Sequence, residues 1–363
     1  FDMMATGSMI MPTLRENQKR KIQHRSICSN PKRYPIETTA NGFEQYRINH
    51  RAFPEIDFSE IDTRCYFLDT HITLPIFISS MTGGDRKGTH INKILASAAE
   101  ALGIPLGTGS IRIALEHEEL SYLFNLRSEA PTVPIFGNIG AVQLAHCDWS
   151  KLNRLVEQLK FSALAVHCNP GQELFQEEGD RDFRGIKDKL AAFIAQAPFP
   201  VIVKETGFGF APDELAFLAS IGARYIDVAG KGGANWILIE GWRSGTIDAA
   251  YEFADWGYST AEMLEKSPKQ GILLASGGIR TAHDVIVALG LGAVACGIAL
   301  PIFRAVLSGG TAGVIEYVSQ LAATVKKKMF LAGCKSVQEL SRPGVIEKNP
   351  DVGLTQWTII RTL

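Results

Sequence analysis

From residue 74 onward, short apolar runs alternate with longer segments whose apolar positions recur at helical spacing. Glycine or proline bounds each apolar run, as is typical of buried strands in a parallel sheet. Eight runs predict strands, at residues 74–79, 104–107, 133–137, 163–167, 201–204, 225–228, 272–275 and 293–297. The segments between and after them predict helices, at residues 89–102, 115–126, 150–160, 181–195, 212–220, 259–266, 281–289 and 311–330.

The seventh predicted helix has the clearest end signals. Thr281 can cap its first turn, Asp284 lies within that turn, and Gly290 follows its last apolar residue. Residues 285–303 carry no charge and are numerous enough to span a bilayer. Glycines and Pro301 divide this stretch into a helix end, a tight turn and a short strand, so we interpret it as a buried α/β unit.

Eight β/α units in one chain predict an α/β fold, a single (β/α)8 TIM barrel, because parallel strands need crossover helices. We assign residues 70–363 to the barrel. Residues 10–69 are polar with several prolines and predict an N-terminal extension. Residues 1–9 contain MATGSM, which resembles a vector-derived leader, so no signal peptide is expected there.

Composition places the chain among ordinary globular proteins. It has 363 residues, of which 46% are hydrophobic, and its 37 basic and 38 acidic side chains give a net charge of −1. There is no basic block, so we expect neither a nucleic acid nor a membrane as partner. The six cysteines are widely spaced without a CxxC pair, which predicts reduced thiols in a cytoplasmic protein rather than a zinc site or a disulfide framework.

Glycine and polar residues follow every predicted strand. The segments are SSMTGG (79–84), TGSIR (108–112), NIGA (138–141), CNPGQE (168–173), ETGFG (205–209), AGKGGANW (229–236), SGGIR (276–280) and IALP (298–301). All lie at strand C-termini, the barrel face that carries chemistry in this fold. Glycine alone is common in turns of any function, but glycine with polar residues on all eight loops predicts a functional site there.

The last two segments favour a phosphate site. Their glycines expose main-chain N–H groups at helix N-termini, where the macrodipole favours an anion. The loops after strands seven and eight are also the usual phosphate position of this fold. The alternative is two tight turns and a surface arginine at position 280.

Lys204 ends the fifth strand and is expected to point toward the barrel mouth. It could be a Schiff-base nucleophile, a fixed cation opposite an electron-rich ring, or a structural lysine paired with Glu205 or Asp227. Asn138 and Thr82 would suit a ring system with amide edges, or would cap turns.

Gln172 and Glu173 lie beside His167 and Asn169 after the fourth strand. A carboxylate among neutral oxygen groups suits Mg²⁺, and ordinary loop solvation is the alternative. Before the barrel, RKIQH (20–24) brings two cations and an imidazole together, although a charged terminal cluster is usually only solvated surface.

Together these motifs resemble the type 2, flavin-dependent isopentenyl-diphosphate isomerase family. They run from about residue 20 to residue 304 and comprise RKxxH, MTGG, GSxR followed by LE, NIG, HxNPxQE, VKExGFG, GKGG and SGGIR. The set is specific, whereas SGGIR and GKGG alone would fit several FMN-binding barrels. The resemblance implies interconversion of isopentenyl and dimethylallyl diphosphate, using reduced FMN, Mg²⁺ bound with the diphosphate, and NAD(P)H as reductant. It also implies a homo-oligomer, a tetramer or octamer.

The resemblance implies roles for individual positions, including an active-site contribution from residues 10–69. FMN would be bound by Ser80, Met81, Thr82, Gly83, Ser110, Asn138, Lys204, Ala229, Ala234, Gly278, Ile279, Arg280, Ala299 and Leu300. The substrate would be bound by Arg20, Lys21, His24, Ser110, Ile111, Arg112 and Gln172. Glu173 would ligate the metal, and the catalytic residues would be Lys204, Gln172, His167 and Asn169.

Some positions depart from the family pattern. Gly171 replaces a leucine, Ile111 a frequent glutamine and Leu300 an arginine. Ala229 and Ala234 replace serine and threonine near the flavin, so contacts at these two positions would be main-chain only.

The chemistry agrees with this inventory, because moving a double bond needs a proton donor and a proton acceptor, and the loops offer no obvious acid of high pKa. Reduced flavin would carry the proton while Lys204 stabilises negative charge on the ring. Two cations gain little from packing on an empty barrel, so we expect residues 20–24 to be mobile until the diphosphate binds.

Three other functions share parts of this pattern. An FMN-dependent 2-hydroxy acid oxidase would need a histidine base, yet no histidine lies between His167 and His283, which falls within the seventh helix. An inosine-monophosphate-dehydrogenase-like enzyme would need Cys168 as nucleophile. A flavin-binding barrel that has lost catalysis would fit Ala229 and Ala234.

Overall fold

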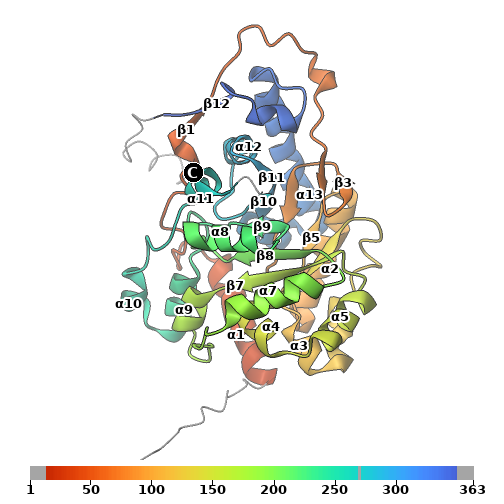
Figure 1. The fold of residues 1–363 in the computed structure, drawn as a ribbon, viewed down its shortest axis with the longest axis vertical. Helices are drawn as coiled ribbons and strands as arrows, with labels where there is room; N and C mark the ends of the chain where they lie inside the picture. Colours follow the sequence, from red (N-terminus) through yellow and green to blue (C-terminus); the bar gives the residue numbers. More distant parts are fainter. Residues whose placement is uncertain (1–13, 269–270, 350–363) are drawn as a thin grey trace, which may run out of the picture.

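The computed structural model describes residues 14–268 and 271–349, and its centre is a closed barrel of eight parallel strands (Figure 1). The strands are β4 (Ile76–Ile78), β5 (Leu106–Gly107), β6 (Ile135–Gly140), β7 (Ala163–Cys168), β8 (Val201–Glu205), β9 (Tyr225–Asp227), β10 (Ile272–Ala275) and β11 (Ala293–Ile298). They follow one another around the barrel in chain order, and β11 closes it against β4. Each overlaps one predicted strand, so the predicted fold class is confirmed.

Helices surround the barrel (Figure 1). They are α2 (Arg86–Leu102), α3 (Arg112–Glu116), α4 (Ala141–His146), α5 (Trp149–Gln158), α6 (Pro170–Phe175), α7 (Ile186–Gln196), α8 (Pro212–Ser220), α9 (Trp236–Ser244), α10 (Ile247–Tyr251), α11 (Thr260–Lys266), α12 (Ala282–Gly290) and α13 (Leu300–Leu331). Helix α12 begins as predicted, because the Thr281 side chain accepts from the Asp284 N–H in a capping box.

Three predicted helices differ from the observed ones. Residues 115–126 form the end of α3 and a 3-10 helix, η3 (Glu118–Phe124), because the backbone is extended at His117. Helix α7 starts five residues later than predicted, after Gly185 in a left-handed conformation. Helix α13 adds a stretch from Leu300 that was not predicted, with Pro301 in its first turn, but Gly310 within it is non-helical (φ 58°, ψ −141°). The part of α13 after this break therefore begins at residue 311, as predicted.

The N-terminal extension contains more structure than its polar sequence indicates. It forms α1 (Leu14–Ser29), β1 (Tyr46–Ile48) and β2 (Cys65–Phe67), with 3-10 turns η1 (Phe43–Gln45) and η2 (Phe58–Glu60), and β3 (Thr70–Ile72) follows directly after it. β1 pairs antiparallel with β12 (Ile346–Lys348), which follows η4 (Val337–Ser341), and β2 pairs with β3. Helix α1 packs against α9 and α13. Residues 1–9, interpreted above as a leader, lie outside the described residues.

The β2–β3 hairpin contributes Phe67 to the core. This ring is fully buried, with its centroid 5.7 Å from that of Phe77 and 5.6 Å from that of Tyr225. Phe67→Ala should lower the free energy of unfolding by about 3–5 kcal/mol, because it removes buried apolar surface and leaves a cavity. Urea denaturation measures this. Phe53→Ala is the control, because Phe53 is 86% exposed; an equal loss in both variants would contradict a packing role for Phe67.

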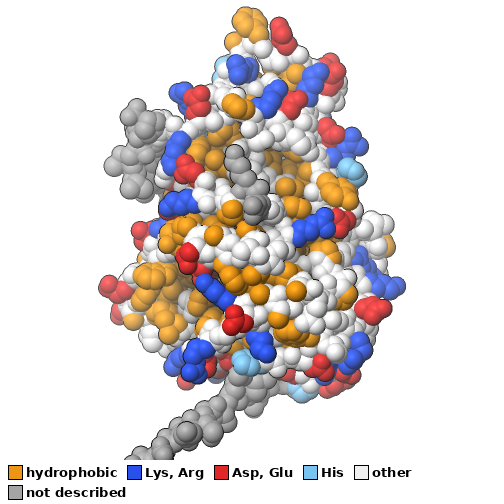
Figure 2. Space-filling view, viewed as in Figure 1, with side chains coloured by type: hydrophobic (Ala, Val, Ile, Leu, Met, Phe, Trp, Pro, Cys, Tyr) orange, Lys and Arg blue, Asp and Glu red, His pale blue; other side chains and the backbone are white. Residues whose placement is uncertain are grey.

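The molecular surface shows no field of one charge on the face in Figure 2, where basic and acidic side chains are interspersed. Within residues 14–268 and 271–349, none of the helices combines the length and the hydrophobicity that a membrane crossing requires. The uncharged stretch 285–303 contains the end of α12 and strand β11, as predicted, and then the start of α13, which was not predicted.

Candidate active site

A cavity of about 290 Å³ opens at the C-terminal ends of the barrel strands. Residues from the strand ends and loops of all eight β/α units line it, and helix α1 of the N-terminal extension adds one wall. The face that carries the glycine and polar segments is therefore hollow, in the position where TIM barrels place their chemistry.

Nearly all of the predicted site residues line this one cavity. They are Arg20, Lys21, His24, Ser80, Met81, Thr82, Gly83, Ser110, Arg112, Asn138, His167, Asn169, Gln172, Glu173, Lys204, Ala229, Ala234, Gly278, Arg280, Ala299 and Leu300. The exceptions are Ile111 and Ile279, whose side chains are fully buried in the hydrophobic core. Only main-chain groups of these two residues could reach a ligand.

Lys204 lies at the floor of the cavity and is itself buried. Its Nζ donates to the main-chain oxygen of Glu205 at 2.6 Å, and the strand register places it between His167 and Asp227. Burial raises the pKa of the Asp227 carboxyl, while Lys204 and a hydrogen bond from Ser276 oppose that rise. The barrel thus fixes an ammonium group at the cavity floor.

His167 and Asn138 form a hydrogen-bonded pair beside this lysine. His167 Nδ1 lies 3.0 Å from Asn138 Oδ1, and an amide oxygen only accepts, so the pair places the imidazole proton on Nδ1. Burial, reinforced by Lys204, lowers the pKa of His167 to about 3. His167 is therefore neutral at physiological pH, and it holds the Asn138 amide with its N–H₂ group free to bind a ligand.

The Glu205 carboxylate organises the loop after β8. Its Oε2 accepts from the N–H groups of Thr206, Gly207, Phe208 and Gly209 at 2.6, 2.6, 2.5 and 3.1 Å. Burial raises the pKa of Glu205 to about 7, against the opposing effect of these N–H groups and Lys204. This loop places Thr206 and Gly207 in the cavity wall.

Several hydroxyl groups in the cavity wall make no hydrogen bond to another described residue. The side-chain oxygens of Ser79, Ser80 and Thr206 are buried and have no hydrogen-bond partner among the described residues. An unsatisfied buried hydroxyl is costly, so these groups indicate a polar ligand in the cavity.

The predicted phosphate loop has the backbone that its glycines suggest. Gly277 and Gly278 have φ angles of 93° and 81°, in the left-handed region. The Arg280 side chain, in contrast, is already paired, because its Nε donates to Glu37 Oε1 at 2.9 Å and its Nη1 to the Ile279 oxygen at 2.7 Å. This carboxylate comes from the N-terminal extension and was not predicted from the sequence.

Helix α1 brings its cations to the cavity and gives them protein partners. Lys21 Nζ donates to the Gly83 oxygen, Arg25 pairs with Asp85 at 2.9 Å, and Arg20 lies 3.6 Å from Glu178. These cations thus have protein partners that the sequence did not indicate, while the mobility of residues 20–24 before diphosphate binding stays a prediction. Helix α1 is held by ion pairs and hydrogen bonds to the barrel loops.

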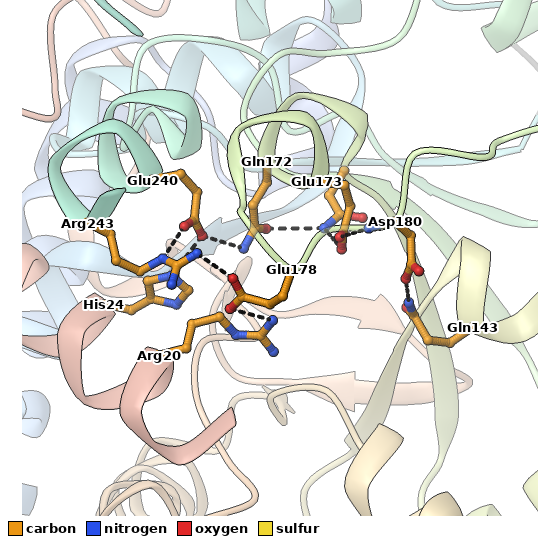
Figure 3. Close-up of polar contacts among 10 residues, drawn as sticks. Arg20, His24, Gln143, Gln172, Glu173, Glu178, Asp180, Glu240 and Arg243 are labelled. Atoms are coloured by element: carbon orange, nitrogen blue, oxygen red, sulfur yellow. Dashed lines mark hydrogen bonds and ion pairs between the residues drawn. The ribbon is translucent and has the colours of Figure 1, made fainter. Parts of the chain in front are cut away.

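Glu240 of α9 is the centre of a polar network that includes the cavity-lining residues His24 and Gln172 (Figure 3). Its fully buried carboxylate accepts from His24 Nε2 at 2.8 Å, Arg243 Nε at 2.5 Å and Gln172 Nε2 at 3.4 Å. Burial alone would raise the pKa of Glu240, but His24 and Arg243 lower it overall. Arg243 also pairs with Glu178, and Glu178 in turn pairs with Arg20, so the network joins α1, α6 and α9.

Glu173 lies on α6 at the edge of this network (Figure 3). Its Oε1 accepts from Asn169 Nδ2 at 2.9 Å and its Oε2 from the Asp180 N–H at 2.9 Å. Burial raises its pKa, opposed by these two hydrogen bonds. Each carboxylate oxygen has two lone pairs, so both retain acceptor capacity.

Glu240, Arg243 and Glu178 were not predicted as site residues from the sequence. A signal for Glu240 was available, since a lone carboxylate follows the apolar run WILI (236–239). Of the rival candidates, Cys168 has its pKa raised to about 12, mainly by burial, so its thiol is not a thiolate nucleophile. His283 lies on α12 with its Nε2 3.0 Å from the Phe43 oxygen, outside the cavity wall.

Known proteins similar to this chain agree on one family. The chain is 38% identical over 336 residues to the isopentenyl-diphosphate delta-isomerase of Borrelia garinii subsp. bavariensis, covering 92% of this chain and 93% of the relative. It is 39% identical over 351 residues to that of Chlorobaculum parvum, covering 91% and 97%. The chain belongs to the isopentenyl-diphosphate delta-isomerase family. The resemblance stated above is confirmed, and the chain is an enzyme of the isomerase class.

Two further comparisons concern the barrel. The FMN-dependent dehydrogenase family model matches residues 147–347, just over half of the chain. A flavocytochrome b2 double mutant with pyruvate bound superimposes with a TM-score of 0.68 at 17% identity, covering 93% of this chain and 86% of that one. At that identity the structure shows a shared fold alone. The 2-hydroxy acid oxidase alternative is therefore not favoured over the isomerase family.

Proposed function

We propose that this protein interconverts isopentenyl diphosphate and dimethylallyl diphosphate by flavin-assisted proton transfer. The observation that carries the proposal is one cavity whose lining combines Lys204 and Asn138 with a charged group formed by Arg20, Lys21 and Glu173, which we call the rim. A charged rim suits a diphosphate, and a fixed cation with an amide suits a flavin ring.

The cavity fits FMN. The unpartnered hydroxyls of Ser79, Ser80 and Thr206 offer hydrogen bonds, and Gly277 and Gly278 form a turn of the kind that binds phosphate. We propose that the predicted FMN residues of the barrel loops bind it, with Ile279 contributing through its main chain. FMN in its reduced form, supplied with electrons by NAD(P)H, would provide a proton donor and acceptor next to the substrate double bond.

The rim fits Mg²⁺ bound together with a diphosphate. The described residues hold no cluster of three or more His, Cys, Asp or Glu side chains at metal-binding spacing. Mg²⁺ is commonly held by one or two carboxylates, waters and substrate phosphates, and Glu173 supplies such a carboxylate. We propose Glu173 as the metal ligand, and the cations of Arg20, Lys21 and Arg112 as diphosphate ligands.

The residues of the chain position the reacting groups. Asn169 donates to Gln172 Oε1 at 3.2 Å while Gln172 donates to Glu240, so the Gln172 amide is held in one orientation at the cavity wall. Trp236, packed edge-on at 5.2 Å from the His24 ring, contributes apolar surface with Ile239 for the hydrocarbon tail. His24, Ser110, His167, Asn169 and Gln172 would orient the substrate, and Lys204 would stabilise negative charge on the ring.

Other properties complete the proposal. We infer that residues 10–69 contribute to the active site of a barrel spanning residues 70–363, and that the protein acts as a cytoplasmic homo-oligomer, a tetramer or octamer, on a small-molecule substrate.

Turnover measured with and without each cofactor tests the function. Protein loaded with FMN, reduced with dithionite and supplied with Mg²⁺ should convert isopentenyl diphosphate to dimethylallyl diphosphate, followed by proton NMR. Removal of flavin or chelation of Mg²⁺ should abolish the conversion. Full turnover without both would refute the mechanism, and dye reduction with lactate instead of isomerisation would indicate the oxidase.

The pH dependence of kcat/KM should report the protonation state of the Lys21 side chain. Burial lowers its pKa to about 8, with Asp85 opposing, so the free enzyme loses this charge as pH rises from 7 to 9. A neutral amine binds diphosphate more weakly, and we expect kcat/KM to fall by up to about tenfold per pH unit above pH 8. Lys21→Arg should keep kcat/KM level across this window, and an identical fall in both proteins would exclude Lys21 as the source.

A further inference from the structure

Residues 36–43 of the N-terminal extension lie against the predicted phosphate loop, at residues 276–280. We call this segment the strap. It is anchored along its length, since the Ile36 oxygen accepts from the Asn235 N–H at 2.8 Å and Thr38 Oγ1 donates to the Ala254 oxygen at 2.9 Å. The Asn41 oxygen accepts from the Ala261 N–H at 3.0 Å.

Asn41 binds the glycine turn directly. The residue is 2% exposed, its Nδ2 donates to the Gly278 oxygen at 2.8 Å, and its Oδ1 accepts from the Phe43 N–H at 3.1 Å. Asn41 approaches the backbone of both glycine loops closely. A Cβ on Gly278 would lie 2.9 Å from Asn41 Cβ, and a Cβ on Gly232 would lie 2.6 Å from the main-chain nitrogen of Asn41. Glycine is thus required at both positions.

The Asn41 hydrogen bond sets the orientation of a peptide group. In a trans peptide the C=O and the following N–H point in opposite directions. With the Gly278 oxygen held by the strap, the N–H of Ile279 points away from the strap. The Ile279 side chain is fully buried, so this N–H is the polar group by which Ile279 could bind an anion.

Glu37 provides the second contact of the strap with this loop. It accepts from Arg280 Nε at 2.9 Å and lies 3.4 Å from Arg304 Nη1, so one carboxylate lies between two guanidinium groups. The Arg280 side chain is thereby held beside the glycine turn rather than extended into solvent.

We propose that the strap, chiefly through Asn41, shapes the phosphate end of the cavity and so determines the preference for a phosphorylated flavin over an unphosphorylated one. Asn41 is a positioning residue, because it acts through the Gly278 peptide and does not line the cavity. The inference rests on the proposed function, since it takes FMN as the ligand.

Binding of FMN and of riboflavin to flavin-free protein tests the strap, because riboflavin lacks only the phosphate. Asn41→Ala and the isosteric Asn41→Asp both remove the donor to the Gly278 oxygen. We expect each to weaken FMN about ten- to hundredfold, as the loss of a buried hydrogen bond would, and to change riboflavin affinity less than twofold. Thr38→Val is the matched control, because it removes an exposed strap hydrogen bond to the Ala254 oxygen, which is not part of the phosphate loop, and it should leave both affinities unchanged.

The ratio of the two affinities separates this role from a structural one. If both Asn41 variants bound FMN and riboflavin with equally weakened affinities, or kept the wild-type ratio of the two affinities, the inference would be overturned. The proposed function would remain intact. A wild-type protein that binds FMN no better than riboflavin would also overturn it. A wild-type protein that binds neither flavin would refute the proposed function, and the inference with it.

Discussion

Replacing Lys204 with alanine should lower turnover about 10²–10³-fold and weaken FMN, which is the usual cost of deleting a preorganised charge opposite a developing one. Lys204 is buried at the cavity floor and held by the main-chain oxygen of Glu205, so its ammonium group is fixed before any ligand binds. Stopped-flow turnover with reduced enzyme and titration of FMN measure the two effects.

Two companion variants make the result interpretable. Lys204→Arg keeps the charge, so it should retain more activity than the alanine variant. Lys231→Ala removes a lysine of the same barrel face that pairs with Asp255 at 2.7 Å outside the cavity wall, and it should behave as wild type. A Lys204→Ala protein with wild-type rate and flavin spectrum would show that the lysine has no role beyond structure. The same conclusion would follow if the flavin-free Lys204→Ala protein were unfolded while the other flavin-free variants remained folded.

The barrel could be predicted because its signals are local. Each β/α unit carries its own apolar run, its own turn glycines and often its own cap, as the Thr281 and Asp284 capping box shows for α12. Eight repetitions of that pattern admit few folds. Helix boundaries were less predictable, because the start of α7 depends on the conformation of Gly185 rather than on periodicity.

The cavity residues could be predicted because the C-terminal ends of all strands lie at one face of this fold. A residue that directly follows a predicted strand is therefore expected at that face. The partners of those residues could not be found in this way. Glu37 and Arg280 are 243 residues apart, and His24 and Glu240 are 216 apart, so only the folded extension brings them together. The partners of the α1 cations, Glu178 for Arg20 and the Gly83 oxygen for Lys21, likewise belong to barrel loops distant in sequence.

Glu173 shows how far sequence and structure together define a role. The sequence offered Mg²⁺ binding and loop solvation as alternatives, and the structure shows a buried carboxylate facing the cavity on the same wall as Gln172. Solvation of an exposed loop is therefore the wrong description of this residue. A buried carboxylate with raised pKa and spare lone pairs gains from a bound cation, because the cation compensates the charge that burial disfavours.

Glu173→Gln should therefore raise the Mg²⁺ concentration needed for half-maximal turnover at least about tenfold and weaken the diphosphate with it, since one charged ligand of the metal is lost. Glutamine is isosteric and can still accept from Asn169 through its single amide oxygen, but it loses the hydrogen bond from the Asp180 N–H, so circular dichroism should confirm that the variant is folded. FMN affinity and the flavin spectrum should not change, because Glu173 belongs to the rim and not to the proposed flavin residues. Glu177→Gln, an exposed carboxylate four residues further on, is the control for the loss of one negative charge in the same loop. If both variants kept the wild-type Mg²⁺ dependence, the metal would have to be bound by the diphosphate and water alone, and Glu173 would be reassigned to positioning Asn169 and the Asp180 loop.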